Sequence, residues 1–386
     1  MRTEFLPFHL PSIADEEIRA VVDTMRSGWL TTGCRVKHFE QEFAKLVGAQ
    51  HAVAVNSGTA ALHLALEALG IGEGDEVIVP TMTFAATAEV VAYLRATPVL
   101  VDCEPTTLNI SCEAVRRAVT SRTRAIVPVH FGGLPCQMDQ LMGVACEHGL
   151  DIVEDAAHAL PASFGGEMIG SMSYATCFSF YATKTITTGE GGMVTTNDAE
   201  RARRMRMMAL HGLSRDAWKR YSREGAWQYE ILAPGFKYNL TDIAAAIGVE
   251  QLRKCCQFWE RRRDIARMYS EAFAESGAIR TPVTTLNTQH AWHLYIVQLE
   301  LDQLRIDRDT FIEELRRQNI GTSVHFMPLH LHPYYRQAFG HAAHEFPNAS
   351  AAFSRILSLP IFPSMSENDV QDVIEAVTAT IERHAR

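Results

Sequence analysis

The sequence lacks the short motifs that mark metal sites and nucleotide-binding loops. Its eight cysteines form no C-x-x-C pair, its 16 histidines form no H-E-x-x-H, and no G-x-x-x-x-G-K-[ST] loop occurs. The cysteine spacings match neither a zinc site nor a small disulfide framework, so free thiols are the simplest interpretation. We therefore predict no metal site and no P-loop.

The sequence also has little positive charge and no long apolar run. Lys and Arg number 36 against 45 Asp and Glu, a formal net charge of −9, whereas nucleic-acid binding usually requires a basic face. The first fifteen residues contain two prolines and Glu4, and no uninterrupted apolar stretch follows, so no secretory signal is predicted. No segment approaches the ~20 apolar residues of a membrane helix. These absences predict a cytoplasmic protein that binds neither nucleic acid nor membrane.

Apolar residues make up 47% of the 386, enough for a large core and for two or three structural units. In the first two-thirds, short apolar runs alternate with helical patterns. The runs typical of buried strands are 51–55, 76–80, 97–102, 125–130, 150–155, 175–180 and 192–196. Residues 59–69 predict a helix capped by Gly70, and Ser12 is a candidate N-cap for a helix that ends near Gly28. This alternation predicts an α/β fold with a mostly parallel sheet flanked by helices.

The pattern changes after about residue 250. Residues 251–276 predict one long charged helix, whose run WERRRD is either a basic patch or, more simply, a solvated helix face. The predicted elements that follow are a strand at 292–301, a helix at 308–318, a strand at 321–326 and a closing helix at 366–384. We therefore predict a large α/β domain at 1–250, with an N-terminal arm at 1–28, and a smaller C-terminal α+β domain at 251–386.

Two segments combine a strand end with groups that bind ligands. After the run 51–55, Gly58 and Thr59 open a helix whose free N–H groups and dipole favour an anion; an ordinary helix cap is the alternative. In DIVEDAAHA, a predicted strand carries Glu154 and Asp155 to its carboxyl end, the edge at which open α/β sheets bind ligands. A structural salt bridge or a helix cap is the alternative there. His158, one helical turn further on, could face the same cleft.

A third segment, FSFYATKTITTGEGG, places Lys184 after the predicted strand 175–180. A lysine that is desolvated at a ligand edge has a lowered pKa and becomes a nucleophile toward carbonyls, whereas an exposed turn lysine is the alternative. A phosphate cradle, an acid and a lysine in this order match the needs of pyridoxal phosphate. Phe84, after the run 76–80, could stack on the cofactor ring or be a core aromatic.

The chain resembles the sugar-nucleotide aminotransferases of the DegT/DnrJ/EryC1/StrS family, within fold type I of the pyridoxal-phosphate enzymes. The resemblance covers nearly the whole chain. It rests on SGWLTTG (27–33), NSGTAALHLAL (56–66), GEGDEVIVPTMTFAAT (72–87), VPVHFGG (127–133), VEDAAHA (153–159), FSFYATKTITTGEGG (178–192), GFKYNLTDIAAAIG (235–248) and VHFMPLH (324–330). It implies pyridoxal 5'-phosphate as cofactor, with pyridoxamine 5'-phosphate as its intermediate form.

The resemblance also implies roles for single residues. Lys184 matches the lysine that forms the Schiff base and carries the proton, and Asp155 matches the acid on the pyridine nitrogen. His158 stands beside the ring and Phe84 at the stacking position. The remaining implied contacts are Gly58, Thr59 and Ser179 to the phosphate, Asn239 to the phosphate of a neighbouring subunit, and Thr31, Thr32, His211 and His325 in the sugar site. The role of Asn239 implies a homodimer with shared active sites.

Within the family, the chain is similar to the branch exemplified by UDP-4-amino-4-deoxy-L-arabinose aminotransferase. The similar segments are FLPFHLPSI (5–13), HGLSRDAW (211–218), LAPGFKYNL (232–240) and HAWHLYIV (290–297). That branch moves an amino group from L-glutamate, which leaves as 2-oxoglutarate, to C4 of a 4-keto sugar nucleotide, for cell-surface polysaccharide, lipid A or natural-product glycans.

Several other functions stay open. They are amination at C3 of the sugar, a non-catalytic regulator on the same fold, and a nucleotide-binding α/β protein without cofactor. The 3-dehydratases of the family carry His in place of the lysine, so Lys184 argues against them.

Overall fold

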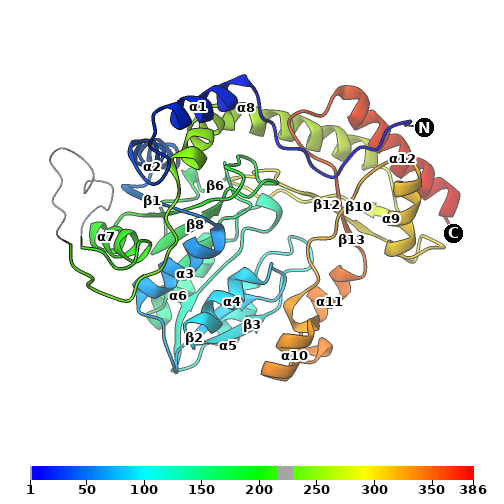
Figure 1. The fold of residues 1–386 in the computed structure, drawn as a ribbon. Coiled ribbons are helices and arrows are strands. Elements are labelled where there is room, and N and C mark those ends of the chain that lie inside the picture. The colour runs from blue at the N-terminus through cyan, green and yellow to red at the C-terminus, as the bar shows by residue number, and fades with distance from the viewer. Residues whose placement is uncertain (1, 215–228) are drawn as a thin grey trace.

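The computed structural model describes residues 2–214 and 229–386 (Figure 1). Its larger sheet has seven strands within these ranges, in the order β1-β9-β8-β5-β4-β2-β3. Their bounds are β1 (His51–Val55), β9 (Gly192–Thr196), β8 (Ala175–Ser179), β5 (Asp151–Asp155), β4 (Thr123–Ile126), β2 (Glu76–Pro80) and β3 (Thr97–Val101). Strands from β8 to β3 pair in parallel, and β9 is antiparallel to both neighbours. The predicted mostly parallel sheet is confirmed.

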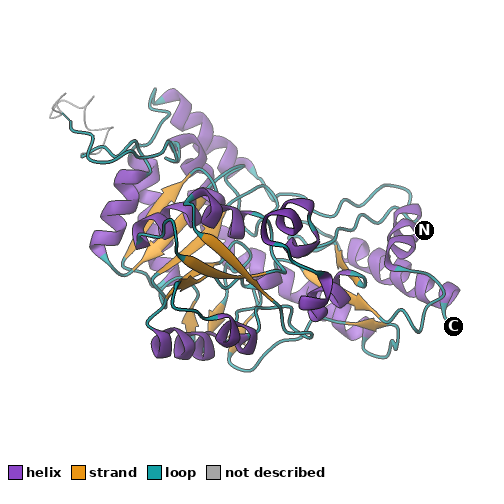
Figure 2. Cartoon of the chain, turned by 90° about the horizontal axis from the view of Figure 1, so that it is seen from below, coloured by secondary structure: helices purple, strands orange, loops and turns teal. Residues whose placement is uncertain are grey.

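Helices cover both faces of this sheet (Figure 2). The helices of this part of the chain are α1 (Asp15–Arg26), which packs on α8, and α2 (Cys34–Val47), α3 (Gly58–Leu69), α4 (Ala86–Tyr93), α5 (Cys112–Ala118), α6 (Met138–His148), α7 (Ala199–Met208) and α8 (Asp242–Phe273). Because side chains alternate along a strand, Val77 and Val79 pack into the core with α3, α4 and α7, whereas Ile78 packs with α5 and α6. Strand β2 is fully buried and corresponds to the apolar run 76–80, which the sequence pattern predicted as a buried strand.

A second, antiparallel sheet has the order β10-β12-β13. Its strands are β10 (Ile279–Arg280), β12 (Tyr295–Leu299) and β13 (Ile356–Leu359), and the helices of this part of the chain are α9 (Arg308–Arg317), α10 (Pro333–Phe339), α11 (Pro347–Phe353) and α12 (Glu367–His384). A small third sheet contains β6 (Ser163–Phe164), β7 (Glu167–Met168) and β11 (Thr288–Gln289). Helix α8 links the cores, with Val249 in the core of the large sheet and Tyr269 in that of the second. The domain boundary predicted at residue 250 falls inside this helix and stays a prediction.

Several predicted element boundaries differ from the structure. Ala14, not Ser12, is the N-cap of α1, and its N–H donates to the Glu17 carboxylate at 2.9 Å. Helix α8 begins at residue 242 instead of 251 because Thr241 caps it by accepting from the N–H of Ala244. Residues 321–326, predicted as a strand, form only an isolated bridge between Ser323 and Ser358.

The predicted helix at 59–69 is confirmed as α3. Ser57 is its N-cap, and its hydroxyl accepts from the N–H of Ala60 at 3.0 Å. Gly70 ends the helix in the left-handed region, at a φ of 83°, where glycine has no steric penalty.

All eight cysteines are free thiols. Within residues 2–214 and 229–386, no group of three or more His, Cys, Asp and Glu side chains is arranged to hold a metal ion. Across the same residues, no helix has the length and apolar character to cross a bilayer.

Candidate active site

The carboxyl ends of β2, β5 and β8 meet at one edge of the large sheet because these strands run in parallel. Asp155 is the last residue of β5, and Phe84 and Lys184 lie in the segments that follow β2 and β8. The structure therefore brings to one edge three side chains that the sequence placed up to 100 residues apart.

Asp155, the last residue of β5, is buried with 6% of its surface exposed. Its Oδ2 accepts a hydrogen bond from Thr87 Oγ1 at 2.8 Å, and its Oδ1 accepts one from the N–H of Ala157 at 3.1 Å. Burial raises the pKa of Asp155, and these two bonds together with the positive charge of Lys184 partly offset that rise. The carboxylate is thus fixed in orientation next to a cation.

Glu154 points to the opposite face of the sheet and contacts different residues. Its Oε2 lies 2.9 Å from His130 Nε2, with both side chains fully buried. The N–H of Cys136 donates to His130 Nδ1, so Nε2 carries the proton and donates to Glu154. His130 and the hydroxyls of Ser173 and Thr176 outweigh burial and lower the pKa of Glu154. Glu154 therefore belongs to a buried hydrogen-bond network on that face, which fits a structural role.

Lys184 lies in the turn after β8, where its N–H donates to the carbonyl of Tyr181 at 2.9 Å. Desolvation lowers the pKa of its amine to about 8, although the negative charge of Asp155 acts in the opposite direction. The exposed-turn alternative does not account for this environment. A lysine with such a pKa is partly a free amine at neutral pH and can act as nucleophile or base.

The start of α3 provides a site for an anion. Gly58 lies against Ser179 so closely that an added Cβ would stand 2.9 Å from the Ser179 Cβ. The N–H groups of Gly58 and Thr59 lie at the tip of the helix, where the helix dipole is positive. The sequence-predicted phosphate contacts therefore meet at one point, and glycine is required there by the close approach.

Aromatic rings surround the site. The His158 ring is buried, lies 4.4 Å from the ring of His293 and stacks on Phe326 at 5.9 Å. Burial holds the pKa of His158 well below its usual value, and its Nδ1 is buried without a hydrogen-bond partner. Phe84 is 64% exposed, with its ring 5.9 Å from Phe326. This exposure argues against the core-aromatic alternative and leaves the ring of Phe84 available to a ligand.

Of the other predicted contacts, Asn239, Thr31 and Thr32 lie together, whereas His325 lies near Lys184. Asn239 Nδ2 donates to Thr32 Oγ1 at 2.7 Å, and Thr32 Oγ1 donates to the carbonyl of Leu240 at 2.6 Å. Thr31 is exposed beside them. His325 lies close enough to Lys184 to sense its charge: burial, together with that charge, lowers the pKa of His325 to about 4. The His325 Nδ1 lies 2.8 Å from Ser358 Oγ.

His211 is an exposed residue with a φ of 57°, held by its N–H to the carbonyl of Phe236. Among the interactions found in the described residues, none joins His211 to Lys184. Its predicted sugar contact stays a prediction. Of the segment HGLSRDAW, residues 215–218 lie outside the described residues.

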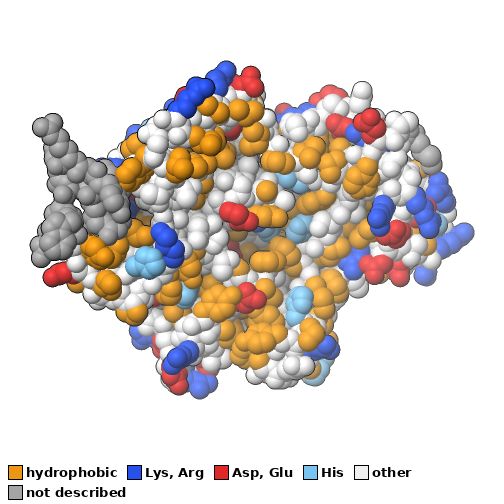
Figure 3. Space-filling model, in the orientation of Figure 1, with side chains coloured by type: hydrophobic (Ala, Val, Ile, Leu, Met, Phe, Trp, Pro, Cys, Tyr) orange, Lys and Arg blue, Asp and Glu red, His pale blue; other side chains and the backbone are white. Residues whose placement is uncertain are grey.

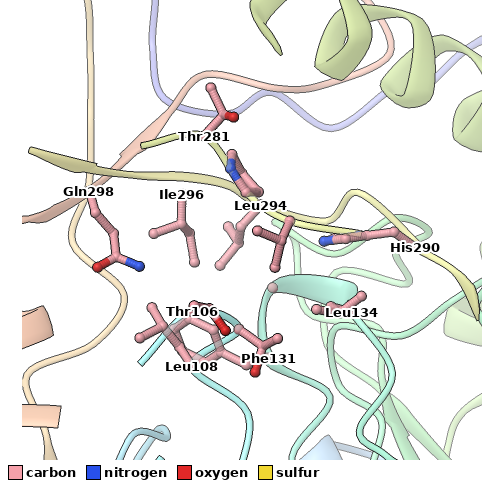
Figure 4. A pocket seen from close by; sticks show the side chains of 13 residues that line it. Thr106, Leu108, Phe131, Leu134, Thr281, His290, Leu294, Ile296 and Gln298 are labelled. Atoms are coloured by element: carbon pink, nitrogen blue, oxygen red, sulfur yellow. The ribbon is translucent and has the colours of Figure 1, made fainter. Parts of the chain in front are cut away.

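A small separate pocket lies between the two main sheets (Figure 4). Leu108 and Phe131 line it from one side, and Leu294 and Ile296 from the other. Its volume of about 30 Å³ is room for a water molecule or two, and neither Lys184 nor Asp155 lines it. It is therefore not the candidate active site.

The residues at the sheet edge fit pyridoxal phosphate. The amine of Lys184 has a lowered pKa, Asp155 is a buried carboxylate, and His158 has an unpartnered ring nitrogen. Gly58 leaves no room for a Cβ at the anion site. Sequence reasoning missed Thr87 and His293, because their contacts with Asp155 and His158 join segments that are distant in the chain.

The chain matches a family model described as the DegT/DnrJ/EryC1/StrS aminotransferase family over residues 11–378. Two curated relatives are 51% identical to it over 377 residues. One is the uncharacterized protein MJ1066 of Methanocaldococcus jannaschii, with 98% of both chains covered. The other is the spore coat polysaccharide biosynthesis protein SpsC of Bacillus subtilis, with 97% of both chains covered and the same 51% identity.

Solved structures resemble the chain along its whole length. The putative sugar aminotransferase Spr1654 from Streptococcus pneumoniae, in its PLP form, is 34% identical with a TM-score of 0.92, covering 98% of this chain and 99% of that chain. Its PMP form gives 35% identity, the same TM-score of 0.92 and the same 98% and 99% coverage. Helicobacter pylori PseC, an aminotransferase involved in the biosynthesis of pseudoaminic acid, is 27% identical with a TM-score of 0.91, covering 99% of this chain and 100% of that chain.

Proposed function

Because the chain belongs to the DegT/DnrJ/EryC1/StrS family and is a pyridoxal-phosphate-dependent sugar aminotransferase, we propose that it moves an amino group from L-glutamate to C4 of a nucleotide-linked 4-keto sugar. Aminotransferase chemistry is supported above all by two side chains at the sheet edge: Lys184, whose amine has a pKa of about 8, and the buried carboxylate of Asp155. The choice of C4 and of a UDP-linked sugar rests on the segments 5–13, 232–240 and 290–297 that resemble a C4-aminating branch.

Pyridoxal phosphate, when bound, supplies an aldehyde that condenses with amines and a ring that takes up the electron pair released at the substrate carbon. Asp155, ionised and held by Thr87 and Ala157, keeps a proton on the ring nitrogen. The anion site of Gly58, Thr59 and Ser179 holds the phosphate group. His158 and Phe84 border the ring.

Lys184 is the proton carrier in this proposal. As a free amine, its Nζ would take the α-proton of glutamate and then give that proton up again, while the amino group stays with the cofactor and 2-oxoglutarate leaves with an oxygen from water. In the second half-reaction Nζ would again take and return one proton, so that C4 of the keto sugar gains the amino group and a hydrogen while its oxygen leaves as water. A pKa near 8 suits both directions, because each form of the side chain is populated at neutral pH.

The sugar site extends from this centre. His325 lies within electrostatic range of Lys184, which supports its proposed contact with the sugar. Thr31, Thr32 and His211 are proposed for the same site on the family resemblance. The role of SpsC in spore coat polysaccharide biosynthesis supports a product destined for a cell-surface glycan.

We propose a homodimer in which Asn239 reaches the phosphate of the neighbouring subunit. Exposed apolar side chains support an interface near the N-terminal helix; they are Leu10, Ile13, Ile18, Met25 and Leu30. Hydrophobic side chains cover much of the face shown in Figure 3, whereas many Lys and Arg side chains lie toward its margins. Apolar side chains gathered on one face are typical of protein–protein contacts.

The test is an amino-transfer assay with L-glutamate over a panel of UDP- and dTDP-linked keto sugars, with the product position determined by NMR. We expect an amine at C4. An amine at C3 would replace the proposal with the alternative C3 aminotransferase. Cofactor binding without transfer to any keto sugar would favour the non-catalytic regulator.

A further inference from the structure

A chain of two buried hydroxyl groups ends on the Asp155 carboxylate. Thr83 Oγ1 lies 2.7 Å from Thr87 Oγ1, and Thr87 Oγ1 lies 2.8 Å from Asp155 Oδ2. Both threonine side chains are inside the protein, at 2% and 0% exposure. In such surroundings a hydrogen bond to a charged group is worth more than in water, because no solvent competes for it.

The direction of the two bonds follows from the number of protons. A hydroxyl has one proton, and an ionised carboxylate can only accept. The proton of Thr87 is therefore committed to Asp155, so Thr83 is the donor to Thr87. The chain points from Thr83 through Thr87 to the carboxylate and stabilises its ionised form.

The same segment also carries Phe84. Thr83 lies in the bend that precedes α4, Thr87 is the second residue of that helix, and the N–H of Thr87 donates to the carbonyl of Phe84 at 3.3 Å. The two hydroxyls therefore tie the segment that presents the exposed ring of Phe84 to the carboxylate of Asp155. A displacement of this segment would move Phe84 and break the hydrogen bond that orients Asp155, and both groups are proposed to contact the cofactor ring.

We propose that Thr87 is the positioning residue of the active-site carboxylate, with Thr83 as its support. This inference rests on the proposed role of Asp155 in pyridoxal-phosphate catalysis. Thr87 holds Oδ2 and the Ala157 N–H holds Oδ1, so together they fix the plane of the carboxylate. Loss of the Thr87 hydroxyl would free Oδ2 to rotate and would raise the pKa of Asp155 further, since this bond is one of the influences that lower it.

Thr87→Val tests the proposal because it keeps the shape of the side chain and removes the hydroxyl. We measure the dissociation constant of pyridoxal 5'-phosphate by absorbance titration between pH 5.5 and 8, and the rate of the half-reaction with L-glutamate. The rate should fall about 10- to 100-fold with little change in KM for glutamate, as expected for the loss of a hydrogen bond to a charged group. On acidification, cofactor binding should weaken at a pH about one unit higher than in the native protein.

Thr81→Val is the matched control, since Thr81 is a buried threonine of the same segment whose Oγ1 bonds to His330 Nδ1 at 2.8 Å. It should lower the melting temperature without moving the pH at which binding weakens. Thr87→Ser should restore binding and rate to within about 3-fold. Should Thr87→Val fail to fold, Thr83→Val provides the same test, with a smaller upward shift of the pH at which cofactor binding weakens.

The background Asp155→Asn separates positioning from general stability. There, Thr87→Val should change the rate less than about 3-fold, because the two residues act as one unit. An equal loss in both backgrounds, or an unshifted pH dependence of binding in Thr87→Val, would overturn the proposal. The sugar substrate does not enter these measurements, so a failure of the proposed C4 specificity would show only in the amino-transfer panel.

Discussion

Replacing Asp155 by Asn should make Lys184 a better nucleophile in the cofactor-free protein and a poorer catalyst in the holoenzyme. Two opposing influences set the pKa of Lys184 at about 8: desolvation lowers it and the negative charge of Asp155 raises it. Asn has nearly the shape of Asp without its charge. In the variant, desolvation acts alone and the pKa of the amine falls further.

The size of the effect follows from these values. With a pKa of about 8, about a quarter of Lys184 is free amine at pH 7.5, against about one part in a thousand for a lysine at the ordinary 10.5. Loss of a nearby opposite charge shifts a pKa by about one unit. The free amine in Asp155→Asn would then reach about three quarters at pH 7.5, a gain of about 3-fold. Transamination should nevertheless fall by about 100-fold, because the ring nitrogen loses its counter-charge.

The assay is competitive labelling of the cofactor-free protein with a lysine-selective reagent from pH 6 to 11, read by mass spectrometry of the peptide that contains Lys184. The peptide with Lys37, an exposed lysine, is the internal reference in each sample. We expect half-maximal labelling of Lys184 near pH 8 in the native chain and at a lower pH in Asp155→Asn. A midpoint near 10.5 in the native chain, or an upward shift in the variant, would refute the reasoning.

Three further predictions concern Lys184, Gly58 and two buried histidines. Lys184→Ala should lose the borohydride-stable attachment of the cofactor, whereas Lys37→Ala should keep it; retained attachment in Lys184→Ala, seen by mass spectrometry, would exclude Lys184. Gly58→Ala should weaken binding of pyridoxal 5'-phosphate and lower the free energy of unfolding by about 1–3 kcal/mol, because the new Cβ would stand 2.9 Å from the Ser179 Cβ. A binding titration measures the first effect and denaturant unfolding the second. Native values in both assays would contradict the close approach. Burial lowers the pKa of His290 to about 3 and of His330 to about 4, so the unfolded chain binds protons below pH 6.5 that the folded chain does not. Each of these histidines should lower stability by up to about 1.4 kcal/mol per pH unit between pH 6.5 and the folded pKa, and a melting temperature that stays constant from pH 6.5 to 5 would be inconsistent with neutral buried imidazoles.

The fold was predictable where local signals and the global packing agree. The apolar run 76–80 is fully buried as β2, and the glycine at position 70 ends α3 as expected. Predictions that relied on one local residue did less well. Ser12 has the side chain of an N-cap, but its carbonyl instead accepts a hydrogen bond from Gln251 in α8, and the helix starts later. That contact joins residues 239 positions apart and has no local signature.

The choice between the two acids of DIVEDAAHA shows the same limit. Glu154 and Asp155 are equal candidates in the sequence, since both stand at the end of one predicted strand. Successive side chains of a strand point to opposite faces, so only one of them can lie on the face where Thr87 of α4 contacts Asp155. Since Glu154 contacts His130 on the far face, Asp155 is the acid that we propose for the cofactor. The assignment of Asp155 by family resemblance agrees with this geometry.

By itself the sequence determined the chemical parts of this protein: a lysine after a strand, an acid after another, and a glycine at a helix start. Their family motifs led to pyridoxal phosphate and sugar transamination, which the family match and the solved aminotransferases confirm. Only the tertiary structure decided the surroundings of these parts. The pKa of Lys184 depends on burial, and the bond from Thr87 to Asp155 joins residues 68 positions apart. Both arise from packing between segments that are distant in the chain, where no spacing or periodicity in the sequence can report them.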